Sequence, residues 1–213
     1  NEVIIDEINV RLNIGEIVTI VGENGSGKST ILRSLFGLSK IFSGEIYLNG
    51  QSNAMIGPSV RSQKLSALFS GQHISKEIYV DDILNFSIDR RCLSESEKKY
   101  TKEKYISFFK IEKYMGRLVS SLSDGMLQRV LITRAFCLET PIVYLDEPTI
   151  FLDIQSQLEI SETVEDLSKE KLILINTHNP IWVKRFNQNI YQVANKVFSK
   201  SSLKELNLDS VLN

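Results

Sequence analysis

A phosphate-binding loop is the clearest chemical signal in this sequence. The pattern G-x-x-x-x-G-K-[ST] is matched by consecutive residues, namely Gly22, Glu23, Asn24, Gly25, Ser26, Gly27, Lys28 and Ser29. In such a loop the glycines let backbone N–H groups point at phosphate oxygens, and the following helix adds the positive end of its dipole. We expect Lys28 to reach the β- and γ-phosphates, Ser29 to bind Mg²⁺ and Thr30 to donate to the α-phosphate. The sequence therefore predicts a nucleoside triphosphate site.

A pair of acids is the second chemical signal. The apolar run 142–145 is followed directly by Asp146 and Glu147. A carboxylate at the end of a strand can hold Mg²⁺ through water, and a second carboxylate beside it can polarise an attacking water. Because many strand-to-loop junctions carry such acids, the interpretation depends on the motifs around them.

Strands and helices alternate around these residues. Strands are expected at 3–10, 17–21, 45–48, 65–69, 142–145, 172–176 and 190–193, and helices at 29–35, 125–138, 154–167 and near Trp182. Such alternation favours an α/β fold, with a parallel sheet covered by helices on both faces. The strand before Gly22 and the helix after Lys28 are the context that a phosphate loop requires.

The middle of the chain has a different character. Residues 78–118 show helical patterning, a charged run that we interpret as a solvated helix face, and no convincing strand. We therefore expect one domain over 1–213, with a nucleotide-binding core (1–72 and 122–213) and an inserted helical subdomain (73–121).

Composition excludes several classes of protein. The 213 residues are 42% apolar, and 25 basic side chains nearly balance 26 acidic ones, so the chain lacks the basic footprint of a general nucleic-acid binder. Apolar runs such as 17–21 are much shorter than the ~18 residues that cross a membrane, and no signal peptide is visible. We expect a soluble chain whose membrane role, if any, comes through a partner.

Along essentially its whole length the chain resembles the ATP-binding-cassette (ABC) ATPases. The resemblance is carried by motifs in the order of that family: the phosphate loop, Leu122-Ser123-Asp124-Gly125-Met126 followed by Gln128-Arg129-Val130, Glu147-Pro148-Thr149, Leu152-Asp153, and Thr177-His178. It implies a phosphate-loop NTPase core, mostly parallel, with an antiparallel β edge and an inserted helical subdomain.

The resemblance also implies roles for individual residues. Glu147 would act on the attacking water, His178 would contact the γ-phosphate, and Lys28 would supply positive charge. Asp146, Ser29 and the glutamine-loop residue Gln72 would lie at Mg²⁺, with Gln72 also near the lytic water. His73 is assigned no role.

Partners follow from the same resemblance. It implies a head-to-tail homodimer in which Ser123 and Gly125 of one subunit close the site where the other subunit binds ATP and Mg²⁺. A membrane permease would dock near Gln72 and the helical insertion, which places the chain in the cytoplasm on the inner face of the membrane, and no nucleic acid is expected. The stretch 122–153 looks most like ATPases of iron-chelate and cobalamin importers, so import of an iron-siderophore, heme or cobalamin type is expected.

Alternatives stay open at this point. An ABC exporter ATPase is one. A non-transport ABC ATPase is another, although residues 73–121 are too short for a DNA-repair coiled coil and a ribosomal type would carry two cassettes. A small phosphate-loop kinase or GTPase would not explain the signature or Thr177-His178.

The chain departs from the family pattern in two ways. Asp124 and Met126 replace the usual glycine and glutamine of the signature, so turnover is expected to be modest. No aromatic residue stands where the family stacks adenine, since Phe36 and Tyr47 come too late. Either the ring precedes Asn1, or adenine rests on an aliphatic residue such as Val3.

Overall fold

A six-stranded sheet forms the centre of the molecule. The computed structural model describes residues 3–23, 25–89 and 93–206. The order of the strands is β4-β5-β6-β1-β7-β8, and every neighbouring pair is parallel except β7 with β8. The strands are β1 (Ile17–Val21), β4 (Leu65–Leu68), β5 (Ile142–Asp146), β6 (Leu172–Asn176), β7 (Ile190–Ala194) and β8 (Val197–Ser201). The predicted α/β fold with a mostly parallel sheet and an antiparallel edge is confirmed.

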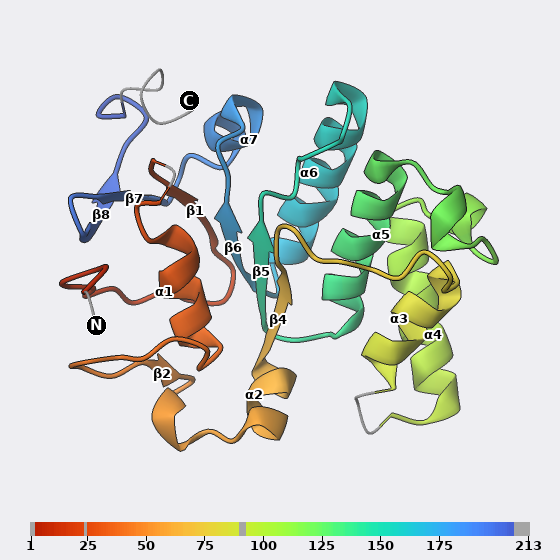
Figure 1. Ribbon diagram of the computed structural model, residues 1–213, viewed down its shortest axis with the longest axis horizontal. Helices are drawn as coiled ribbons and strands as arrows, with labels where there is room; N and C mark the ends of the chain where they lie inside the picture. Colours follow the sequence, from red (N-terminus) through yellow and green to blue (C-terminus); the bar gives the residue numbers. More distant parts are fainter. Residues whose placement is uncertain (1–2, 24, 90–92, 207–213) are drawn as a thin grey trace.

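Helices cover both faces of this sheet (Figure 1). The helices of the described structure are α1 (Lys28–Leu35), α2 (Pro58–Lys64), α3 (Val80–Ile88), α4 (Glu95–Phe108), α5 (Asp124–Cys137), α6 (Ile154–Ser168) and α7 (Pro180–Arg185). A separate hairpin pairs β2 (Tyr47–Leu48) with β3 (Gln51–Ser52). None of the helices among the described residues is both long and apolar enough to cross a membrane.

Alternation along the strands separates two cores. On β5, Val143 and Leu145 face the α5 and α6 side, whereas Tyr144 faces the α1 side. Successive side chains of a strand point to opposite faces, so a strand buried on both faces needs a continuous apolar run. The sheet is therefore the middle layer of three, and the carboxyl ends of β1, β5 and β6 meet at one edge.

The helical part of the chain lies at one end of the molecule. Helices α3 and α4 pack against α5, far from α1 (Figure 1). Helix α4 begins at Ser94, whose hydroxyl accepts from the backbone N–H of Glu97 while the Glu97 carboxylate accepts from the Ser94 N–H. This reciprocal cap explains a helix whose charged surface is otherwise weakly patterned. The exact limits of the helical subdomain, 73–121, stay a prediction.

The sheet edge differs from the expectation. Residues 3–10 were expected to form a strand, but in the described structure they make a single parallel bridge, between Glu7 and Val197. Ile4, Ile8 and Val10 of this segment are exposed, so no second sheet buries their side chains.

The antiparallel edge is instead made by β8, which the sequence reasoning missed. It returns from β7 through the two-residue turn Asn195-Lys196, both of which have positive φ values, 50° and 65°. That is the backbone of a type I′ hairpin turn.

Candidate functional site

The phosphate loop connects β1 to α1. Gly27 is the N-cap of α1 and adopts φ 106°, a left-handed conformation that an L side chain rarely takes. A Cβ there would also lie 2.6 Å from Ile4 Cγ2, so the N-terminal segment packs directly on the loop. The hydroxyl oxygen of Ser26 is buried and has no hydrogen-bond partner within the described residues. A buried hydroxyl of this kind fits a loop that donates to phosphate oxygens.

Lys28 turns its ammonium group back into this loop. Its Nζ donates to the backbone carbonyls of Gly22, at 2.5 Å, and Glu23, at 2.8 Å. Burial lowers the pKa of Lys28, and the negative charges of Glu147 and Asp146 partly offset that shift. Lys28 is thus the cation of a site whose acids lie at the end of β5, which β6 separates from β1 in the sheet.

The other loop residues have mixed surroundings. Ser29 and Glu23 are exposed, and Thr30 is half-buried. Asn24 lies outside the described residues. Val3, to which adenine contact was assigned as one option, is exposed, and that contact stays a prediction.

Asp146 is held at the end of β5 by donors from both neighbouring strands. The hydroxyl of Ser70, just beyond β4, donates to Oδ2 at 2.7 Å, and Nδ2 of Asn176 on β6 donates to Oδ1 at 2.5 Å. The residue is only 4% exposed. Neither Ser70 nor Asn176 was identified from the sequence, although Ser70 follows one expected strand and Asn176 ends another at the same sheet edge. These contacts fix the orientation of a carboxylate, the type of oxygen ligand that hard cations take.

Glu147 and His178 are brought together by the ends of β5 and β6. The backbone N–H of Glu147 donates to the Asn176 carbonyl at 2.8 Å, and its carboxylate accepts from the backbone N–H of His178 at 3.1 and 3.3 Å. Nε2 of His178 lies 3.6 Å from Oε1 of Glu147. Burial raises the pKa of Glu147, and His178 opposes that shift. A carboxylate with a raised pKa is suited to accept a proton from water near neutral pH.

The side chain of Gln72 contacts helix α5. Its side-chain oxygen accepts from Nη2 of Arg134, on α5, at 2.6 Å. Its assigned contact with Mg²⁺ stays a prediction, and the loop reaches Asp146 through Ser70 instead. His73 is exposed.

The signature segment begins α5. Ser123 is its N-cap, and its hydroxyl accepts from the backbone N–H of Met126 at 3.3 Å. The Met126 sulfur in turn accepts from the Ser123 N–H at 3.5 Å, so a weak sulfur acceptor closes the capping box. A Cβ on Gly125 would lie 2.5 Å from the Phe151 carbonyl oxygen. Gly125 is thus required by packing within its own chain.

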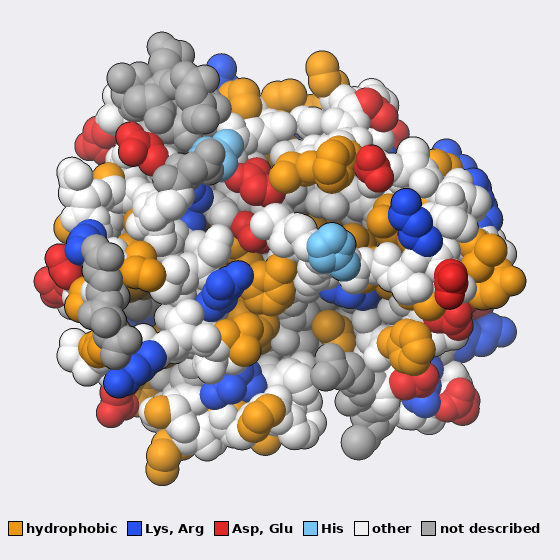
Figure 2. All heavy atoms as spheres, in the orientation of Figure 1, with side chains coloured by type: hydrophobic (Ala, Val, Ile, Leu, Met, Phe, Trp, Pro, Cys, Tyr) orange, Lys and Arg blue, Asp and Glu red, His pale blue; other side chains and the backbone are white. Residues whose placement is uncertain are grey.

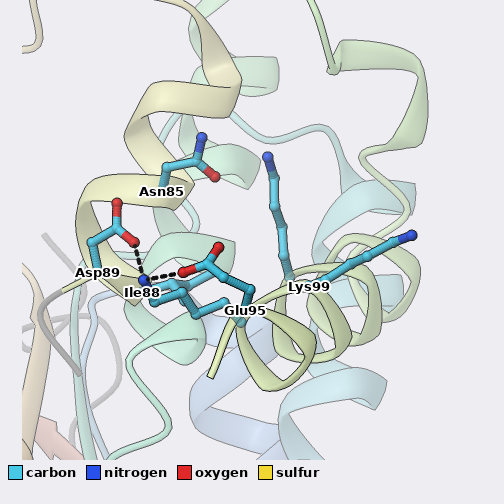
Figure 3. Close-up of a pocket in the computed structure, with 7 residues that line it drawn as sticks. Asn85, Ile88, Asp89, Glu95 and Lys99 are labelled. Carbon is cyan, nitrogen blue, oxygen red and sulfur yellow. Dashed lines mark hydrogen bonds and ion pairs between the residues drawn. The ribbon is translucent and has the colours of Figure 1, made fainter. Parts of the chain in front are cut away.

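A small pocket between α3 and α4 is separate from this site. It has a volume of about 290 Å³ and contains Asp89, Glu95 and Lys99 in its wall (Figure 3). Lys98, also in the wall, pairs with Asp89 at 3.0 Å and Glu95 at 2.8 Å. Both acids of the pocket are therefore paired with Lys98, whereas Lys99 pairs with Glu103 and Lys102 with Asp81, outside the pocket wall.

Comparison with known proteins agrees with this geometry. The family described as ABC transporter matches residues 5–150. The probable siderophore transport system ATP-binding protein YusV of Bacillus subtilis is 31% identical over 91% of this chain and 73% of its own length. The Glutathione/L-cysteine transport system ATP-binding/permease protein CydC of Escherichia coli is 30% identical, over 93% of this chain but 35% of its own length.

Solved structures support the same assignment. An ATP-binding subunit of an ABC transporter superimposes with a TM-score of 0.83 at 27% identity, covering 94% of this chain and 84% of the other. A dimeric ATP-binding cassette in a post-hydrolysis state with ADP and Pi gives 0.82 at 25% identity, covering 94% and 90%. This chain therefore belongs to the ABC transporter family and is the ATP-binding, ATP-hydrolysing subunit of a transporter.

Proposed function

We propose that this subunit drives solute import, of an iron-siderophore, heme or cobalamin type, through a separate membrane permease. The observation that carries the proposal is the similarity to a siderophore-system ATPase over 91% of the chain. The Iron(3+)-hydroxamate import ATP-binding protein FhuC of Bacillus subtilis, 28% identical over 92% of the chain, points the same way. Work with such a permease would place the subunit in the cytoplasm, on the inner face of the membrane.

The residues at the sheet edge support an in-line attack of water on the γ-phosphorus. Glu147 takes the proton of the water, the new P–O bond forms, and the bond to the β–γ bridging oxygen breaks to leave ADP and phosphate. Lys28 and His178 balance negative charge on the phosphate oxygens. Glu147 suits its role because its pKa is raised while its carboxylate is aimed by the His178 N–H.

Mg²⁺ fits the oxygen ligands of this site. Asp146, fixed by Ser70 and Asn176, and the hydroxyl of Ser29 at the start of α1 would hold it. When bound, the ion neutralises charge on the β- and γ-phosphate oxygens. A contact from Gln72 requires its amide to leave Arg134 first.

The signature residues support a head-to-tail dimer. Ser123 is exposed at the start of α5, where a second subunit can reach it, and Gly125 beside it is partly exposed. In the proposed dimer, Ser123 and Gly125 of each subunit close the site around the ATP bound by the other subunit. The dimeric state of the post-hydrolysis cassette described above is consistent with this assembly.

An apolar groove offers the permease a docking place. It has a volume of about 680 Å³ and runs between α2 and β4 on one side and α3 on the other, where the surface in Figure 2 is hollowed. Phe69, Ile74 and Phe86 contribute apolar walls, and the Gln72–Arg134 pair lies in the same groove. A permease segment seated there would touch Gln72, which we expect to lie near Mg²⁺ and the lytic water.

Uptake measurements test this function directly. Deleting the gene should abolish cellular uptake of radiolabelled ferric siderophore, heme or cobalamin, whichever is the solute. Wild-type protein should restore the uptake, and the Glu147→Gln variant should not. Unchanged uptake of all three classes would contradict the import proposal. Accumulation of a solute in the deletion strain would favour the exporter alternative.

A further inference from the structure

The loop that carries Glu147 has an unusual backbone. Glu147 has φ 47° and Phe151 has φ 65°, so two residues other than glycine adopt left-handed conformations within one short loop. Such a conformation is strained in a residue other than glycine and persists only where surrounding contacts impose it. The direction of the Glu147 side chain therefore depends on what holds this loop.

Helix α5 holds the beginning of the loop through Gln128. Its Nε2 donates to the backbone carbonyl of Pro148 at 3.1 Å and lies 3.4 Å from that of Glu147. The Glu147 carbonyl also accepts from the Ile150 N–H at 3.3 Å. Because the carbonyl direction defines ψ of Glu147, these donors help to fix the backbone from which the carboxylate projects.

The same helix supports the far end of the loop. The Phe151 carbonyl lies so close to Gly125 that even a methyl group there would collide with it. Gly125 and Gln128 are one turn apart on α5, and they contact opposite ends of the loop. A shift of the first turns of α5 must therefore move the loop or break one of these contacts.

We propose that Gln128 is a positioning residue for Glu147, through which the signature helix and the catalytic carboxylate move as one unit. This inference rests on the proposed role of Glu147 in hydrolysis. In a head-to-tail dimer, Ser123 and Gly125 of one subunit meet the ATP of the other. Closure of one site would then set the orientation of the Glu147 carboxylate in the other site, so that ATP hydrolysis at the two sites is coupled.

Gln128→Met tests the contact because methionine has a similar length and no donor. We expect kcat to fall about tenfold or more, with KM and ATP affinity within about twofold of wild type. Gln188→Met, at an exposed position after α7, is the matched control and should leave kcat unchanged. Gln128→Asn, which is too short to reach both carbonyls, should reproduce the loss and serves if Gln128→Met does not fold.

A double-mutant cycle distinguishes positioning from a general structural defect. In single-turnover reactions, Gln128→Met should slow wild-type hydrolysis but have almost no effect on the residual hydrolysis of Glu147→Gln. Wild-type kcat in both Gln128 variants, or equal losses in the two backgrounds, would overturn the proposal. If Glu147→Gln itself hydrolyses ATP normally, the proposed role of Glu147 has failed instead.

Discussion

The backbone N–H of His178 contacts both carboxylate oxygens of Glu147, at 3.1 and 3.3 Å, although the two residues are 31 positions apart. The donor belongs to the main chain at the end of β6, so the carboxylate is oriented by the sheet itself. The imidazole Nε2 lies 3.6 Å from Oε1. Orientation of the proposed base by the main chain and the γ-phosphate contact proposed for the imidazole are thus separable roles of one residue.

Glu147→Gln should separate ATP binding from ATP hydrolysis. Glutamine keeps the shape and can still accept from the His178 N–H, but it cannot take a proton from water. We expect ATP to bind while turnover falls about 10²- to 10⁴-fold. Glu162→Gln, on the exposed face of α6, is the matched control. Turnover at the wild-type rate would place the base elsewhere.

The same variant should trap the dimer. With ATP bound and not cleaved, Glu147→Gln should elute as an ATP-dependent dimer in size-exclusion chromatography. Adding Ser123→Arg should remove that dimer, because the closing segment could no longer approach the γ-phosphate. A Glu147→Gln protein that binds ATP and stays monomeric at saturating ATP would contradict a head-to-tail dimer formed by this chain alone.

Glu147 should also make stability depend on pH. Burial raises its folded pKa above the unfolded value, so its favourable contribution is fully present below the unfolded pKa and is lost as pH rises through the folded pKa. In nucleotide-free protein, Glu147→Gln should therefore have the higher Tm at pH 7. The difference should shrink as pH falls toward about 4.3, the ordinary pKa of glutamate. A Tm difference that does not change with pH would contradict this origin.

Lys28→Ala should abolish ATP binding and leave the fold intact, because the ammonium is the cation that faces both acids. Wild-type protein should gain roughly 2.7 kcal/mol of stability at an ATP concentration of 100 times Kd, and the variant should gain none. Thermal unfolding with and without ATP measures both. Lys169→Ala, at an exposed surface pair, should respond as wild type does. Near-normal ATP affinity in folded Lys28→Ala would refute the site.

Met126→Gln should give equal or higher ATPase activity. An amide oxygen accepts from the Ser123 N–H more strongly than the thioether sulfur that now lies 3.5 Å away. Met126→Leu, which has no acceptor, should be equal to or slower than wild type. Loss of more than about tenfold in Met126→Gln, about 1.4 kcal/mol in barrier height, would show a separate role for the methionine.

Local motifs made part of this site predictable. The strand, loop and helix around Lys28 are contiguous, and Asp146 directly ends an apolar strand, so their placement follows from local pattern. The contacts of Ser70 and Gln128 join segments that are 76 and 20 positions apart, and no local pattern specifies such pairs. Strand β8 was missed because it is rich in polar side chains and lacks a clear apolar pattern. It forms because the turn after β7 places it antiparallel to that strand.

The position of β1 in the sheet has a consequence for synthesis of the chain. Both of its neighbours, β6 and β7, begin more than 150 residues after it starts. At roughly 5–20 residues per second, the ribosome needs on the order of ten seconds to make them after β1 has emerged. Until then the strand that leads into the phosphate loop has no partner on either side. Nucleotide binding therefore requires translation at least through β6 and β7, because a product that ends before Leu172 lacks both strands that flank β1.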